Sequence, residues 1–174
     1  NTGTAKRAAF EPPSSEPVIE SINLATGGRR VIAEGATDGS WSRNGRYFVY
    51  VNRDSHGIVV LDTSTGKRRV ISETGISPCL TPDGLSIIFV DQGWNDLFYQ
   101  LYRAPIEGGK PEQLTTDGNW WKPEISPDGE WVICTGYGVS RYSHSPLLRV
   151  FSIRERMSYY IRIDNAETAE MGTW

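Results

Sequence analysis

The chain lacks most of the features that reveal a chemistry directly. Its 174 residues contain no run of about twenty apolar residues, so we expect no membrane-spanning helix. It has two histidines and two cysteines, and it lacks the motifs of serine-hydrolase elbows, zinc proteases, phosphate-binding loops and EF-hands. We therefore expect no cofactor and no metal site. Whether the chain is part of an enzyme stays open, and these absences favour a non-catalytic role.

The chain also lacks an excess of positive charge. Lys and Arg number 18 against 21 Asp and Glu, which makes the formal net charge −3. Because nucleic acid binding needs a basic face, we do not expect nucleic acid as a partner. The run GKRR (66–69) is locally basic. We interpret it as a solvated hairpin tip, with a binding patch as the alternative.

The cysteines and the N-terminal segment say little about the compartment. Cys79 and Cys134 match no metal-binding or redox spacing, so we interpret them as free thiols, with a disulfide as the alternative. Residues 1–16 are polar, rich in Pro and Ser, and lack the apolar core of a signal peptide. We interpret them either as a loosely ordered N-terminal segment or as part of a longer chain.

What the chain does have is a repeat. The segments WSRNGRYFVYV, LTPDGLSIIFV and ISPDGEWVICT begin at Trp41, Leu80 and Ile125. Pro-Asp-Gly suits a type I turn followed by a left-handed glycine, which is a common hairpin connection; the first copy has Arg-Asn-Gly instead. A second hairpin follows each first one, so each unit holds four strands in about 40 to 45 residues.

A four-stranded unit of this length cannot bury both of its faces alone. Radial stacking against its neighbours would bury them and would make each unit a β-propeller blade. The predicted fold is therefore all-β, with blades of four antiparallel strands. We expect about three complete blades plus a leading half blade.

The repeat resembles the WD40-like (PD40) repeats of TolB-type propellers. The resemblance rests on SPDG and TPDG followed by alternating apolar residues and on LYRAPIEGGKPEQLTTDG (101–118), and it covers roughly residues 17–163. It implies a propeller of six or seven blades in most members. Such propellers occur in periplasmic TolB, prolyl oligopeptidases, tricorn-type proteases and oligogalacturonate lyases, so the motif indicates a fold rather than a function. A periplasmic or extracellular location is favoured by this resemblance alone.

The repeat also predicts the blade boundaries. We expect the following segments: a half blade at 17–35, complete blades near 36–72, 76–116 and 120–163, and the start of a further inner strand at 170–174. These blades cannot close a ring of four to eight by themselves. Three outcomes stay open: a piece of a longer propeller, which is favoured, a homodimer closing one ring, or a fourth blade built from the terminal strands.

Inner strands of a propeller line its central channel. Alternation along these strands predicts that three apolar residues pack between blades: Trp41, Leu80 and Ile125. Their neighbours Ser40, Cys79 and Glu124 are then expected to face the channel. A single carboxylate is not an acid–base pair, so a solvated lining is favoured over catalysis.

Loops at one end of the blades predict a ligand-binding rim. The candidate rim residues are Arg53, His56, Trp94, Trp120, Trp121, Arg141, Tyr142 and His144. Flat aromatic rings beside hydrogen-bonding groups suit a protein, peptide or carbohydrate partner. The alternatives are that each Trp packs on the blade beneath it, that the histidines are only solvated, or that His56 and His144 bind a metal.

The favoured function is a non-catalytic binding or interaction module that presents this rim to a protein, peptide or carbohydrate. One alternative is the propeller portion of an enzyme. Such an enzyme would be a prolyl-oligopeptidase-like peptidase with a gating propeller, or an oligogalacturonate-lyase-like polysaccharide lyase that uses His144. A purely structural assembly module is the third hypothesis.

Overall fold

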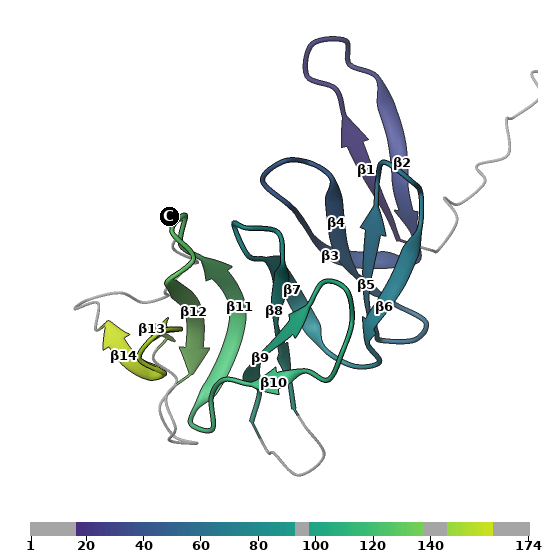
Figure 1. The fold of residues 1–174 in the computed structure, drawn as a ribbon. Coiled ribbons are helices and arrows are strands. Elements are labelled where there is room, and N and C mark those ends of the chain that lie inside the picture. The colour runs from purple at the N-terminus through teal and green to yellow at the C-terminus, as the bar shows by residue number, and fades with distance from the viewer. Residues whose placement is uncertain (1–16, 93–97, 138–145, 162–174) are drawn as a thin grey trace, which may run out of the picture.

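The computed structural model describes residues 17–92, 98–137 and 146–161, and every regular element in these ranges is a β-strand (Figure 1). The strands pair in chain order into one two-stranded and three four-stranded antiparallel sheets. No helix among the described residues has the length and apolarity needed to cross a membrane.

We call the two-stranded sheet the half blade and the four-stranded sheets blades 1 to 3. The half blade consists of β1 (Val18–Ile22) and β2 (Arg29–Glu34). Blade 1 consists of β3 (Ala36–Trp41), β4 (Tyr47–Asn52), β5 (Ile58–Asp62) and β6 (Arg68–Ser72). Blade 2 consists of β7 (Ile76–Leu80), β8 (Ser86–Asp91), β9 (Gln100–Pro105) and β10 (Glu112–Gln113). Blade 3 consists of β11 (Asn119–Ile125), β12 (Trp131–Tyr137), β13 (Pro146–Ser152) and β14 (Met157–Ile161).

The turn between the first two strands of each blade is held by one repeated set of hydrogen bonds. In blade 3 the Ser126 hydroxyl donates to Asp128 Oδ1 at 2.5 Å and accepts from the Trp131 N–H at 2.9 Å. The Glu130 N–H donates to the same Asp128 oxygen at 3.0 Å. Gly129 takes the left-handed conformation, with φ of 77°, that the turn requires.

The same bonds recur in the other two blades. Thr81 and Asp83 take the places of Ser126 and Asp128 in blade 2. In blade 1 the pair is Ser42 and Asn44, and the amide oxygen of Asn44 accepts the two bonds that a carboxylate accepts elsewhere. A four-residue motif therefore sets each inner hairpin, and it does so locally.

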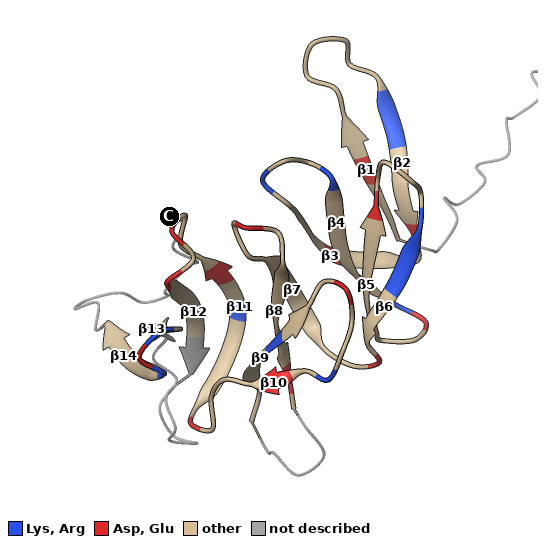
Figure 2. Ribbon diagram, viewed as in Figure 1, with Lys and Arg blue, Asp and Glu red and all other residues tan. Residues whose placement is uncertain are grey.

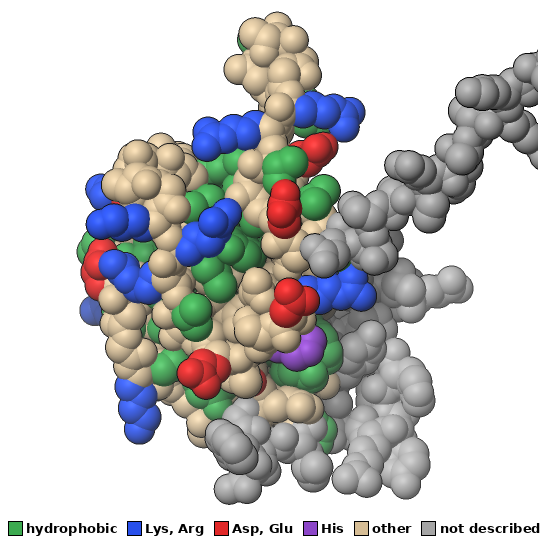
Figure 3. Space-filling view, turned by 90° about the vertical axis from the view of Figure 1, so that its right-hand side faces the viewer, with side chains coloured by type: hydrophobic (Ala, Val, Ile, Leu, Met, Phe, Trp, Pro, Cys, Tyr) green, Lys and Arg blue, Asp and Glu red, His purple; other side chains and the backbone are tan. Residues whose placement is uncertain are grey.

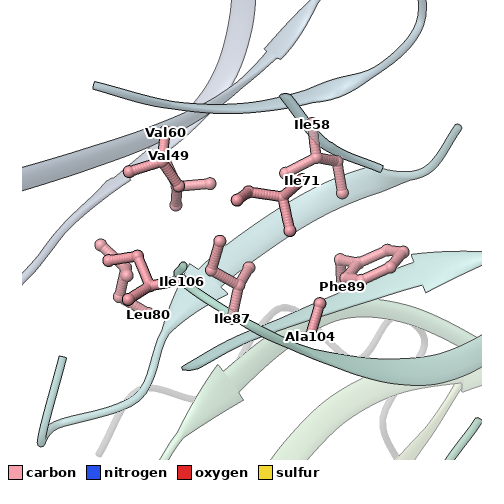
Figure 4. Packing of buried hydrophobic residues seen from close by; sticks show 9 residues of the cluster. All are labelled: Val49, Ile58, Val60, Ile71, Leu80, Ile87, Phe89, Ala104 and Ile106. Carbon is pink, nitrogen blue, oxygen red and sulfur yellow. The ribbon is translucent and has the colours of Figure 1, made fainter. Parts of the chain in front are cut away.

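The blades pack face to face. Figure 4 shows the interface between blades 1 and 2, where β4, β5 and β6 meet β7, β8 and β9. Its buried residues are Val49, Ile58, Val60, Ile71, Leu80, Ile87, Phe89, Ala104 and Ile106. Removing this apolar surface from water is the dominant favourable term in holding the two sheets together.

Blade 2 is covered on both faces. Ile87 and Phe89 face blade 1, while Ile88 and Val90 pack with Trp120 and other residues of blade 3. This is why β8 has no polar side: the five residues from Ser86 to Val90 are all buried. A continuous apolar run is typical of a strand that has a neighbour on each face.

The first strands of the three blades, β3, β7 and β11, lie side by side in that order, and the later strands of each blade extend outward from them (Figure 1). Four-stranded antiparallel sheets arranged with their first strands together form the blades of a β-propeller. The predicted fold class, with three complete blades and a leading half blade, is confirmed.

Candidate functional site

The three inner strands share an irregularity at the same position. The antiparallel register of β3 with β4 shifts between Thr37 and Gly39, and β7 and β11 shift at the equivalent places. At each shift one residue other than glycine has a positive φ: Asp38 at 45°, Ser77 at 49° and Lys122 at 46°. An extra unpaired residue of this kind is a β-bulge, which bends a strand and redirects its side chains.

The sequence explains why the bulges occur there. Each bulge residue precedes Gly39, Pro78 or Pro123, and proline has no N–H to donate to a ladder. Gly39 has a different role, because a Cβ at this position would collide with the Phe48 ring. Sequence reasoning missed the bulges, although a Gly or Pro at the same place in three aligned strands was a usable signal.

The bulges converge on one hollow of about 270 Å³, lined by residues 38–40, 77–79 and 122–124. We call this the inner-strand hollow. Its charged side chains are two carboxylates, Asp38 and Glu124, and one ammonium, Lys122. A neighbouring hollow of about 390 Å³ shares Ser40, Cys79 and Glu124 and continues toward the first turn of each blade. The inner-strand hollow is thus small, polar and of mixed charge.

The structure brings together the three residues expected in the channel. Ser40, Cys79 and Glu124 come from three different blades and line the same hollow. Ser40 and Glu124 are half-buried. Their role as the lining of a closed channel stays a prediction.

Two predictions made from the alternation of side chains along the inner strands need correction. Cys79 is only 8% exposed and packs in the core shared with blade 3, whereas Leu80 packs in the core shared with blade 1. Because a middle blade has a neighbour on each face, alternation there divides residues between two interfaces rather than between core and channel. Trp41, expected between blades, is 42% exposed, with its ring centroid 4.8 Å from that of Phe48.

The two thiols are free and buried in the same core cluster. Burial, and to a lesser degree the charge of Glu124, raises the pKa of Cys79 far above its ordinary value. Burial also raises the pKa of Cys134, with Cys79 as the next cause. Both sulfurs stay protonated at neutral pH, so neither is an activated nucleophile.

The structure does not bring the predicted rim residues together on one surface as it does the channel candidates. Trp120 is fully buried and must be removed from the rim: its Nε1–H donates to the Asp117 carbonyl at 2.7 Å, and its ring stands edge-on to Phe151. The tertiary reason is that Trp120 belongs to the core between blades 2 and 3, where the guanidinium carbon of Arg149 lies 3.9 Å from its ring centroid.

The other rim candidates are dispersed or outside the described residues. Arg53 and His56 are exposed on the turn between β4 and β5, and Trp121 is half-buried, 4.4 Å from Tyr99 between ring centroids. Among the residues that the structure describes, no hydrogen bond, ion pair or ring contact joins Trp121 to Arg53 or His56. Four candidates lie outside the described residues: Trp94, Arg141, Tyr142 and His144. The expected further inner strand at 170–174 lies outside them as well.

Within residues 17–92, 98–137 and 146–161, no three His, Cys, Asp or Glu side chains come together in a way that could hold a metal ion. The groups that line the inner-strand hollow offer hydrogen bonds and charge.

Comparison with family models and with curated proteins finds no match to this chain. Solved structures do match. TolB from Acinetobacter baumannii is similar with a TM-score of 0.73 and 22% identity, over 84% of this chain and 38% of that chain. A protein described as TolB from Agrobacterium tumefaciens has a TM-score of 0.68 and 22% identity, over 78% of this chain and 53% of that one.

A third similar structure is a chain of a nidogen/laminin complex, with a TM-score of 0.65 and 15% identity over 83% of this chain and 56% of that one. The chain thus spans about two fifths to somewhat over half the length of these proteins. At such identities the common feature is the architecture, and the chain has the fold of a TolB-like β-propeller.

Proposed function

We propose that this chain is a non-catalytic binding module whose inner-strand hollow receives an extended segment of a protein partner. The observation that carries the proposal is the convergence of three β-bulges, from three blades, on one polar hollow. Bulges occur preferentially beside functional sites, where they re-aim side chains out of a regular ladder.

A polypeptide suits this hollow better than an apolar small molecule does. Among the described residues no aromatic side chain lines the hollow, and its walls carry Ser40 and Ser77 beside Asp38, Glu124 and Lys122. Such groups pair with the amides and the charged side chains of a peptide. The similar chain in the nidogen/laminin complex supports a protein partner, since it was determined in a protein–protein complex.

The test uses a random displayed peptide library selected against the chain, followed by fluorescence anisotropy with the selected peptides. Lys122→Glu and Asp38→Lys reverse exposed charges in the hollow, and we expect each to weaken binding by about tenfold or more, which is the size of a lost charged hydrogen bond. Lys110→Glu is the matched control, because Lys110 is exposed but lies outside the hollow.

Equal binding by all three variants would place the peptide elsewhere and contradict the proposal. Mass spectrometry of the same mixtures addresses the alternative that the chain acts as part of an enzyme. Cleavage of a selected peptide by the chain, lost in the hollow variants, would favour that alternative over simple binding.

A further inference from the structure

A separate hollow of about 310 Å³ lies in the wedge between blades 1 and 2, at the outer end of their interface. We call it the basic groove. Its floor is formed by Val60 and Tyr47, which border the core shared by the two blades. Its charged walls come from Arg46 in the turn before β4, from Asp62 at the end of β5, from Lys67 and the first residues of β6, and from Glu107 of blade 2. None of its lining residues belongs to the inner-strand hollow.

Two ion pairs fix the walls of the basic groove. Arg46 Nη2 lies 3.1 Å from Asp62 Oδ2 on one side. On the other side Arg69 Nη1 lies 2.8 Å from Glu107 Oε2 and donates to the carbonyl of Ile106 at 3.0 Å, which joins blade 1 to blade 2. These two ion pairs neutralise the negative charges of Asp62 and Glu107, the two carboxylates in the lining.

Two further cations in the lining have no such partner. Lys67 and Arg68 are exposed, and among the described residues neither side chain makes an ion pair or a hydrogen bond. The lining therefore holds four cations and two carboxylates, an excess of two positive charges. Arg68 lies at the edge of the groove, because it pairs with Leu61 on the opposite face of the blade from Arg69. Figure 2 shows the run of positive residues along β6, and Figure 3 shows basic side chains gathered on the face turned to the viewer.

We propose that the basic groove is a binding site for a phosphate or sulfate group, either as the free ion or as the ester of a small organic molecule. Guanidinium and ammonium groups form strong charge-assisted hydrogen bonds with such oxyanions, and arginine presents a planar fork of donors to them. The floor of Val60 and Tyr47 offers an apolar surface on which the organic part of an ester can lie.

Positive charge on β6 has a simpler explanation, which the chain itself allows us to test. Outer strands of sheets are often charged to prevent edge-to-edge association. The half blade repeats the same sequence, Arg-Arg-Val-Ile, on β2, but Arg29 and Arg30 do not line the groove. Arg29→Ala/Arg30→Ala thus removes the same net charge from an equivalent edge strand and serves as the matched control for Lys67→Ala/Arg68→Ala.

The experiment is calorimetric titration at low ionic strength with inorganic phosphate, sulfate, glucose 6-phosphate and glucose. We expect saturable binding of the anions and none of glucose. Lys67→Ala/Arg68→Ala should weaken phosphate binding by about tenfold or more, and the control pair by about twofold at most. Affinity for glucose 6-phosphate above that for phosphate indicates an ester ligand, whereas equal affinities indicate the free ion; either supports the site.

Equal weakening in both double variants would show that only diffuse charge attracts the anion, and it would overturn the proposal. Titrations that do not saturate would overturn it as well. All four substituted side chains are exposed, so unchanged thermal unfolding will show that both double variants keep the fold.

Discussion

At the scale of single residues, blade 3 is organised around Arg149. Its side chain is 1% exposed and lies between the rings of Trp120 and Tyr160, and its Nη2 is 2.7 Å from Asp117 Oδ2. The guanidinium also fills the space beside Gly118, where a Cβ would collide with it. A buried charge that is paired, hydrogen-bonded and stacked on aromatic rings is costly to disturb.

Gly118→Ala tests this arrangement. Gly118 and Gly45 have nearly the same φ, 73° and 70°, so alanine introduces the same backbone strain of about 1–2 kcal/mol at either position. A Cβ added at Gly45 would meet no atom within 4 Å, whereas a Cβ added at Gly118 would collide with the Arg149 guanidinium. We expect Gly118→Ala to lower the free energy of unfolding by about 1–3 kcal/mol more than Gly45→Ala, from overpacking. Urea unfolding measures both, and equal losses would contradict this account of Arg149.

The residue scale is also where sequence reasoning was weakest. Trp120 precedes Trp121 at the start of a strand, and both were candidates for a binding rim, with packing on the blade beneath as the alternative. Trp120 follows that alternative. It is buried in the core between blades 2 and 3, where Arg149, 29 positions later, stacks on its ring. A contact over that separation leaves no local pattern in the sequence.

At the scale of elements, the hairpin turns follow from their own residues. Ser or Thr, any residue, Asp or Asn, then Gly is enough to set the bonds described above, so the turns were predictable. The bulges in β7 and β11 also have a local cause in Pro78 and Pro123, whereas Gly39 of β3 makes room for the Phe48 ring of the next strand. The three bulges meet at one hollow only when three different blades are stacked, so no local sequence pattern predicts this meeting.

The turn carboxylates predict a pH dependence. The Thr81 hydroxyl, and then the Leu85 N–H, hold the pKa of Asp83 below its ordinary value, and the Ser126 hydroxyl and the Glu130 N–H do the same for the pKa of Asp128. A folded-state pKa below the unfolded one adds stability that is present above the unfolded value of about 4 and is lost as pH falls through the folded value.

Asp83→Asn/Asp128→Asn should therefore flatten the acid limb of the stability curve. Asn44 already makes the equivalent bonds with an amide that does not titrate, so the double variant should keep the turns. Thermal unfolding between neutral pH and about pH 2.5 measures the difference. The melting temperature of the double variant should fall less than that of the unchanged chain below about pH 4. Parallel curves would show that the turn carboxylates do not contribute.

At the scale of the whole molecule, the stacking of blades supplies the core. Ile87 is fully buried between blades 1 and 2, whereas Leu85, two residues earlier in the chain, is 65% exposed. We expect Ile87→Ala to reduce the free energy of unfolding by about 2–5 kcal/mol and Leu85→Ala by at most about 0.5 kcal/mol. Denaturant unfolding of the two variants compares them. A small loss at Ile87 would mean that the blades do not depend on one another.

The same scale separates residues that the repeat aligns from residues that only the stacked blades bring together. The repeat placed Ser40, Cys79 and Glu124 at equivalent positions, and the structure puts all three on one hollow. The GKRR run, which contributes to the basic groove, was interpreted as a solvated hairpin tip, with a binding patch as the alternative. One wall of the groove comes from blade 2, where Glu107 pairs with Arg69 of blade 1.

The sequence by itself determined the strands, the turns and the division into blades, because hairpin chemistry and a two-residue alternation act between near neighbours. Tertiary structure alone decided that both faces of blade 2 are covered, that Trp120 is buried under Arg149, and that bulges from three blades meet in one hollow. The physical reason is that burial and charge pairing depend on distance in space, and the stacking of sheets brings together residues that lie tens of positions apart in the chain.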